Sequence, residues 1–233
     1  MLAAAELNSD KPPLQTSAAA EAARYTLLRR LAPSMRHHLV VNLQPIGMIY
    51  EVMDRRLRAP EPDLANVHES AHKINGFARA ALNSCLDVVS WLAPDDSVTC
   101  TVSEAAAECA GLLATSLSFR GFALRNQVGS VAGSVRRSSI RNLLTGALIC
   151  ITDEYRPPAE LILRARAQTQ GASLSLTLTR TDGEQGFAPE AGYRHLTWAD
   201  LQALALAEGA QATREGEQGI HLLLPWSQQP AQA

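Results

Sequence analysis

Hydrophobic residues between positions 28 and 92 recur at alternating steps of three and four, in two blocks. This spacing predicts two long helices, each with one continuous apolar stripe. The segment between the blocks, residues 58–63, is short and rich in proline, so the two helices are expected to form an antiparallel hairpin. The first stripe consists of Leu28, Leu31, Met35, Leu39, Leu43, Ile46, Tyr50, Met53 and Leu57, and the second of Leu64, Val67, Ala71, Ile74, Ala78, Ala81, Cys85, Val88 and Leu92.

A single hairpin of this kind cannot bury both stripes well. Two copies that pair through their hairpins would bury them in a four-helix bundle. The pattern therefore predicts a homodimer.

The hydrophobic period changes after Pro94, where short alternating runs are interspersed with helical ones. Mixed strands and helices in this order predict an α+β fold, in which helices cover one face of a sheet. The expected domains are a loose lead-in (1–19), the helical hairpin (20–94), the α/β part (95–226) and a loose tail (227–233). Strands are expected over 97–101, 122–128, 160–168, 173–180, 212–214 and 220–224, and helices over 103–118 (with Ser103 as N-cap), 137–151 and 197–208.

Composition and charge reduce the number of function classes that the sequence allows. The formal net charge of −2 argues against a nucleic-acid partner. No apolar run approaches the ~20 residues that span a bilayer, and charged residues interrupt the N-terminus before a signal peptide can form, so a cytoplasmic protein without a membrane anchor is expected. The four cysteines show no CxxC pairing, and Cys85, Cys109 and Cys150 are expected to be buried free thiols.

Candidate chemistry is concentrated in the first helix, at His37. Helical geometry turns His37 roughly 200° away from both Met35 and Leu39, and so away from the apolar stripe. Pro45 removes one helical hydrogen bond and is expected to bend the helix beyond the histidine. An outward imidazole is largely neutral near pH 7 and can act as the nucleophile of a phosphoryl relay. The alternative is that His37 and His38 are merely a solvated surface pair.

The segment His37-His-Leu-Val-Val-Asn-Leu-Gln-Pro-Ile46 resembles the phosphoacceptor box of bacterial sensor histidine kinases, in the variant H-D-L-N-N-L-L-T-P-I. The resemblance makes His37 the phosphoacceptor. His38 replaces the acidic residue that assists autophosphorylation, and Val41 replaces a residue that positions water. If His38 were the acceptor, Asn42 would stand at the position of the residue that positions water. In that alignment, however, the leucines and the proline would no longer match the box.

The resemblance extends over residues 25–226. Asn142-Leu-Leu-Thr-Gly-Ala147 is similar to the N-L-L-x-N-A box of the ATP-binding domain, with Gly146 in place of the asparagine that binds Mg²⁺. The segment 182–190 resembles the adenine-reading box, in which Asp182 would hold the adenine amino group and Glu184 replaces a glycine. The later glycine-rich phosphate lid has no counterpart. Asn142 and Asp182 thus mark a relic nucleotide site.

A dimerising hairpin with an acceptor histidine and a degenerate ATP-binding domain is similar to the dimeric bacterial histidine phosphotransferases. This resemblance implies that no cofactor is bound, that the partners are response-regulator receiver domains, and that the receiver supplies the Mg²⁺. Arg36, with Arg29 and Arg30, is expected to help dock an acidic receiver surface, and His38 and Asn42 to support the acceptor.

Two other functions stay open. The first alternative is a pseudokinase that binds a receiver or a kinase without carrying phosphate. His68-Glu-Ser-Ala-His72 also fits the H-E-x-x-H signature of zinc peptidases, in which Glu69 would be the general base. No third histidine follows at close spacing, and Lys73 occupies a position that is usually apolar in such proteases.

Overall fold

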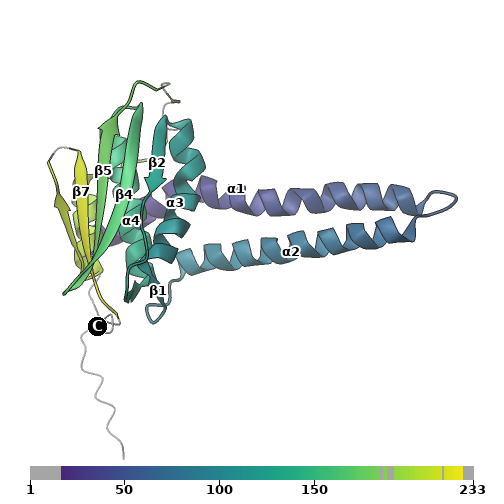
Figure 1. Ribbon diagram of the computed structural model, residues 1–233, viewed down its shortest axis with the longest axis horizontal. Helices are drawn as coiled ribbons and strands as arrows, with labels where there is room; N and C mark the ends of the chain where they lie inside the picture. The colour runs from purple at the N-terminus through teal and green to yellow at the C-terminus, as the bar shows by residue number, and fades with distance from the viewer. Residues whose placement is uncertain (1–16, 184–185, 188–191, 217, 228–233) are drawn as a thin grey trace, which may run out of the picture.

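The computed structural model describes residues 17–183, 186–187, 192–216 and 218–227. Two long antiparallel helices, α1 (Ala18–Leu57) and α2 (Leu64–Leu92), project from a compact α/β part (Figure 1). The hydroxyl of Ser17 caps α1 by accepting a hydrogen bond from the Ala20 amide, and Asp63 caps α2 through the Asn66 amide. The predicted hairpin is confirmed. Helix α1 begins inside the expected lead-in, of which residues 1–16 lie outside the described chain.

From Leu39 onward, the predicted stripes divide into two sets, and within each helix the members of a set are spaced seven residues apart. One set is partly or fully buried inside the hairpin and comprises Leu39, Ile46, Met53, Val67, Ile74, Ala81 and Val88. The alternate set is exposed and comprises Leu43, Tyr50, Leu57, Leu64, Ala71, Ala78, Cys85 and Leu92. The expectation that Cys85 is buried is therefore wrong for a single chain, because its side of α2 faces away from α1.

The α/β part contains a five-stranded sheet in the order β2-β4-β5-β7-β6. Strand β2 runs parallel to β4, and the other pairs are antiparallel. A separate antiparallel pair joins β1 and β3, and β3 was not predicted from the sequence. The strands are β1 (Thr99–Thr101), β2 (Phe122–Asn126), β3 (Ser134–Arg136), β4 (Ala159–Gln168), β5 (Gly171–Arg180), β6 (Gln211–Arg214) and β7 (Gly219–Pro225).

Helices α3 (Val102–Phe119) and α4 (Arg137–Glu154) lie against one face of this sheet, and α5 (Trp198–Ala207) packs on α4. The N-cap of α3 is Thr101 and not Ser103, because the Thr101 hydroxyl accepts a hydrogen bond from the Glu104 amide and the Glu104 carboxylate accepts one from the Thr101 amide, which forms a capping box. The arrangement is α+β, as predicted. None of the helices in the described residues is both long and apolar enough to cross a membrane.

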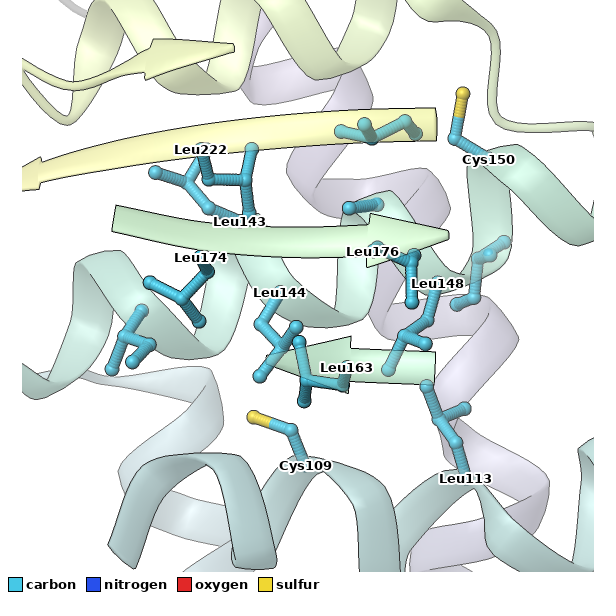
Figure 2. Close-up of a cluster of buried hydrophobic side chains, with 14 of the residues drawn as sticks. Cys109, Leu113, Leu143, Leu144, Leu148, Cys150, Leu163, Leu174, Leu176 and Leu222 are labelled. Carbon is cyan, nitrogen blue, oxygen red and sulfur yellow. The ribbon is translucent and has the colours of Figure 1, made fainter. Parts of the chain in front are cut away.

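The core lies between the sheet and its helices. Figure 2 shows Leu144 and Leu148 of α4 beside Leu163 of β4 and Leu176 of β5, all of them almost fully buried. Each such leucine contributes about 1.5–3 kcal/mol by leaving water. Cys109 and Cys150 lie in the same core, as predicted, and burial raises the pKa of the Cys150 thiol to about 12.

The first half of α1 also belongs to this core. Ala20, Ala23, Leu27 and Leu31 are completely buried where α1 crosses α4 and α5. One continuous helix therefore has a part packed on the α/β core and a part that projects into the hairpin, with His37 close to the transition.

Helix α2 is attached to the same core through Arg141 of α4. The Arg141 guanidinium donates to Ser90 Oγ (2.8 Å) and Asp87 Oδ1 (2.6 Å) on α2, and to Glu108 on α3. It also lies 4.7 Å from the ring centroid of Trp91, at cation–π distance. Both helices of the hairpin are thus fixed to the α/β part at their base.

Candidate functional site

His37 lies on the exposed surface of α1, as its helical spacing predicts. Its ring centroid is 6.3 Å from that of His38, which is also exposed. Both histidines line a pocket of about 510 Å³ between α1, α3 and the segment that leads into α5, a volume typical of small-molecule sites. The pocket is lined by Arg30, Pro33, Ser34, His37, His38, Leu112, Thr115, Ser116, Phe119, Arg120, Phe187, Tyr193 and His195.

Two arginines of this pocket share one buried carboxylate. Asp153 at the end of α4 is 1% exposed and accepts from both terminal nitrogens of Arg30 at 2.7 and 2.8 Å. Arg120 donates to the same carboxylate at 3.0 Å. Burial, together with the charge of Arg30, lowers the pKa of Arg120 below its usual value, against the opposing effect of Asp153. The cluster carries a net charge of one positive unit beside His37.

Arg30 is therefore not available to dock a receiver, contrary to the expectation from sequence, because its guanidinium is committed to Asp153 and only 9% of its side chain is exposed. Arg29 lies 5.8 Å from the rings of Tyr25 and Tyr193. Arg36 is exposed on α1 and remains a docking candidate.

Asn42 stabilises the hairpin. Its amide nitrogen donates to the His38 carbonyl at 3.1 Å and to Ser84 Oγ of α2 at 3.2 Å. These contacts connect the turn of α1 that follows the histidines to α2. Asn42 is thus a structural support for the turn that carries His38, and its amide contacts α2 across the hairpin.

His195 was assigned no role from the sequence. This residue lies in the segment before α5, 158 positions from His37 in the chain, yet both line one pocket. Its neighbours fix the segment: Arg194 Nε donates to Thr26 Oγ1 of α1 at 3.1 Å, and the Leu196 amide donates to Asp153 Oδ2 at 3.1 Å. No local sequence pattern around His195 indicated this proximity, since it depends on how α1 packs on the α/β part.

Gly146, which the sequence resemblance places at the position of a Mg²⁺-binding asparagine, lies on the face of α4 that is covered by α5. A Cβ atom at Gly146 would lie 3.3 Å from Leu201 Cδ1, 3.4 Å from Leu204 Cδ1 and 3.7 Å from Leu196 Cδ2. All three leucines are 1% exposed or less. The glycine thus allows α5 to approach α4 closely, and apolar side chains occupy the space that a metal ligand would need.

Asn142, one turn earlier on α4, donates to Glu208 Oε1 at 2.9 Å. The same buried carboxylate accepts from Arg24 of α1 at 2.9 Å and from Ser139 at 2.8 Å. Asp182 is exposed after the end of β5, and it is not among the described residues that line the pocket around Asn142 and Glu208. Asp182 is therefore not part of the pocket that Asn142 lines, and Glu184 lies outside the described residues.

The pKa of Glu208 gives a prediction for stability against pH. Burial acts to raise this pKa, but hydrogen bonds from Asn142, Ser139 and Arg24 outweigh it, so the pKa lies below its usual value. An unfolded glutamate titrates at about 4.3, so the stabilisation is complete above that pH and is lost as the pH falls through the lower, folded pKa. Thermal unfolding of Glu208→Gln is therefore expected to show a weaker loss of Tm between about pH 5 and 3 than the parent chain. An unchanged pH slope would contradict this role.

The H-E-x-x-H segment lies on the exposed face of α2. Glu69 forms an ion pair with Lys73 at 2.7 Å, and this interaction lowers the pKa of its carboxyl group. Within the part of the chain that the structure describes, no three histidine, cysteine or acidic side chains come together as a metal site. The geometry of His68 and His72 therefore gives no support to a zinc peptidase.

No protein-family model matches the chain, and no curated protein matches it. Solved structures of similar fold include the Acinetobacter baumannii histidine kinase AdeS, with 10% identity, 82% of this chain and 98% of that chain covered, and a TM-score of 0.42. A histidine kinase from Burkholderia phymatum STM815 has 15% identity, 87% and 97% coverage, and a TM-score of 0.41. A bacterial phosphotransferase has 12% identity, 85% and 95% coverage, and a TM-score of 0.41. These values describe a distant likeness of fold and carry no conclusion about function.

Proposed function

We propose that this chain is a histidine phosphotransfer protein of two-component signalling. It accepts a phosphoryl group on His37 from the aspartate of one receiver domain and passes it to the aspartate of another. The observation that supports this most is the placement of His37, which lies exposed on α1 and lines a pocket together with Arg30 and Arg120, whose two positive charges exceed the single negative charge of their partner Asp153.

The chemistry of such a carrier requires little from the chain itself. A neutral imidazole nitrogen attacks the phosphorus of an aspartyl phosphate, and the aspartate leaves as a carboxylate. The Mg²⁺ is supplied by the receiver. The chain must present the imidazole without steric obstruction and hold it still, and the attachment of α1 to the core just before His37 meets the second requirement.

The buried face of α4 supports a function without ATP. Leu196, Leu201 and Leu204 fill the space next to Gly146, and Arg24 of α1 reaches the carboxylate that holds Asn142. A nucleotide could enter there only if α5 and the first half of α1 separated from α4. That separation would expose leucine side chains that are worth about 1.5–3 kcal/mol each when buried.

The exposed set of hairpin positions supports the homodimer. Leu82, Leu86 and Val89 of α2 are each more than half exposed and extend the apolar face formed by Leu43 and Tyr50 of α1. A contiguous apolar surface of this kind marks an interface in soluble proteins. A second copy of the hairpin presents the same face and would complete the alternating stripes of both chains.

Leu86→Asp is expected to convert the dimer into a monomer. Leu86 is 59% exposed in the single chain, so the substitution costs little there, but it places a charge in the centre of the proposed bundle. Sedimentation or light scattering checks the mass, with Leu206→Asp as the matched control, since Leu206 is exposed on α5, which is not part of the proposed bundle. A parent chain that sediments as a monomer would reject the proposed dimer.

The proposed function is tested by incubating the chain with purified receiver domains that carry labelled aspartyl phosphate. Label is expected to move to the chain, to survive alkali and to be released by acid, as phosphoramidates are. It is then expected to pass to a second, unlabelled receiver. Stable binding to a receiver without transfer of label would support the pseudokinase regulator instead.

A further inference from the structure

His195 faces the His37 pocket, and its own side chain has no structural task among the described residues. The hydrogen bonds that fix its segment come from Arg194 and from the Leu196 amide. Within the described chain, the His195 imidazole has no hydrogen-bond or ion-pair partner, and it is exposed. A side chain held by its neighbours, but not itself bonded, is free to contact a ligand in the pocket.

The surroundings of His195 favour an anion. Arg30 and Arg120 together carry two positive charges against the single charge of Asp153. No aspartate or glutamate is among the residues described as lining this pocket, whereas Ser34, Thr115 and Tyr193 add hydroxyl groups. A doubly charged phosphoryl group on His37 would gain more from this environment than from a neutral surface.

We propose that His195 is a positioning residue for phosphoryl transfer at His37, an inference that rests on the proposed function. In the transfer, the bond between phosphorus and the aspartyl oxygen of the receiver breaks, and a bond between phosphorus and a His37 ring nitrogen forms. The other His37 nitrogen keeps its proton. The His195 imidazole donates its N–H to a non-bridging phosphoryl oxygen and holds the group over the Arg30–Asp153–Arg120 cluster.

The test compares His195→Ala and His195→Gln in the full chain, with His72→Ala as the control for loss of an exposed histidine elsewhere. The rate of label transfer from a phosphorylated receiver is measured as a function of receiver concentration. Loss of one hydrogen bond to a charged group predicts a maximal rate about tenfold lower in His195→Ala, with the half-saturating receiver concentration nearly unchanged. His195→Gln keeps an N–H donor and is expected to restore most of the rate.

The lifetime of the label on His37, after the receiver is removed, gives a second measurement. It is expected to shorten in His195→Ala and to recover in His195→Gln, because the amide again holds the phosphoryl group away from water. Equal maximal rates in the parent chain and His195→Ala would overturn the inference, as would a change confined to half-saturation, which indicates docking. A parent chain that takes up no label overturns the proposed function itself, and this outcome is distinct from both.

Discussion

Replacement of His37 by alanine is expected to abolish transfer of label from phosphorylated receivers, down to the background of a reaction without the chain. The imidazole is the only group of this residue that can form the phosphorus–nitrogen bond, and alanine has no nucleophile to replace it. Because the His37 side chain is exposed, its removal is expected to change the free energy of unfolding by no more than about 0.5 kcal/mol. The loss of activity would then be chemical and not structural.

His38→Ala is the matched control, since His38 is the adjacent residue, is also exposed and lines the same pocket. This variant is expected to keep its label, with at most a modest change in rate. Label that persists in His37→Ala and disappears in His38→Ala would transfer the acceptor role to His38. Circular dichroism and thermal unfolding of both variants confirm that the fold is intact.

Gly146→Asn, which restores the metal-binding residue of the resembled box, is expected to destabilise the chain without creating an ATP site. The new side chain would push into Leu201 and Leu204 and bury an amide among apolar groups. Overpacking and an unsatisfied buried amide each cost about 1–3 kcal/mol, so unfolding free energy should fall by about 2–6 kcal/mol. Denaturant unfolding measures this loss, and titration with Mg-ATP is expected to show no binding in either chain.

The Gly146→Ala variant separates the cost of overpacking from the cost of burying an amide. Its methyl group meets the leucine side chains at 3.3–3.4 Å, which requires only a small shift of their flexible ends. Alanine also gains up to about 1 kcal/mol of helix propensity over glycine, so this variant should be close to the parent in stability. If the Gly146→Asn variant were as stable as the parent chain and bound Mg-ATP, this result would contradict the prediction. It would show that α5 moves away from α4 readily and that the chain keeps a usable nucleotide site.

The elements of this fold were predictable from the sequence where one local pattern determined them. The hairpin followed from sustained steps of three and four, and strands β4 and β5 followed from the alternating runs over 160–168 and 173–180. Strand β3 was missed because it is three residues long and exists through its pairing with β1. Burial of Cys85 was mispredicted because the periodicity identifies an apolar stripe but not which partner covers each part of it.

In the candidate site, too, the sequence predicted the residues that belong to a local motif, but not those that depend on tertiary contacts. His37 was identified by its position in a continuous motif, and its exposure followed from helical geometry. The roles of Arg30, Asp153 and His195 depend on contacts between segments more than 100 residues apart, which no local pattern encodes. Gly146 was identified as a lost ligand, but its close contact with α5 became evident only from the packing of Leu201 and Leu204.

The attachment of both hairpin helices to the α/β core has a mechanical consequence. A protein that phosphorylates its own histidine must let its nucleotide-binding part travel to that histidine and withdraw again. Here Arg30 of α1 pairs with Asp153 of α4, Arg24 of α1 pairs with Glu208 at the end of α5, and Asp87 of α2 pairs with Arg141 of α4. Such an excursion would break these ion pairs at once. If the proposed function holds, the hairpin and the α/β part stay joined during transfer, and phosphate reaches His37 through the diffusion of the partner proteins.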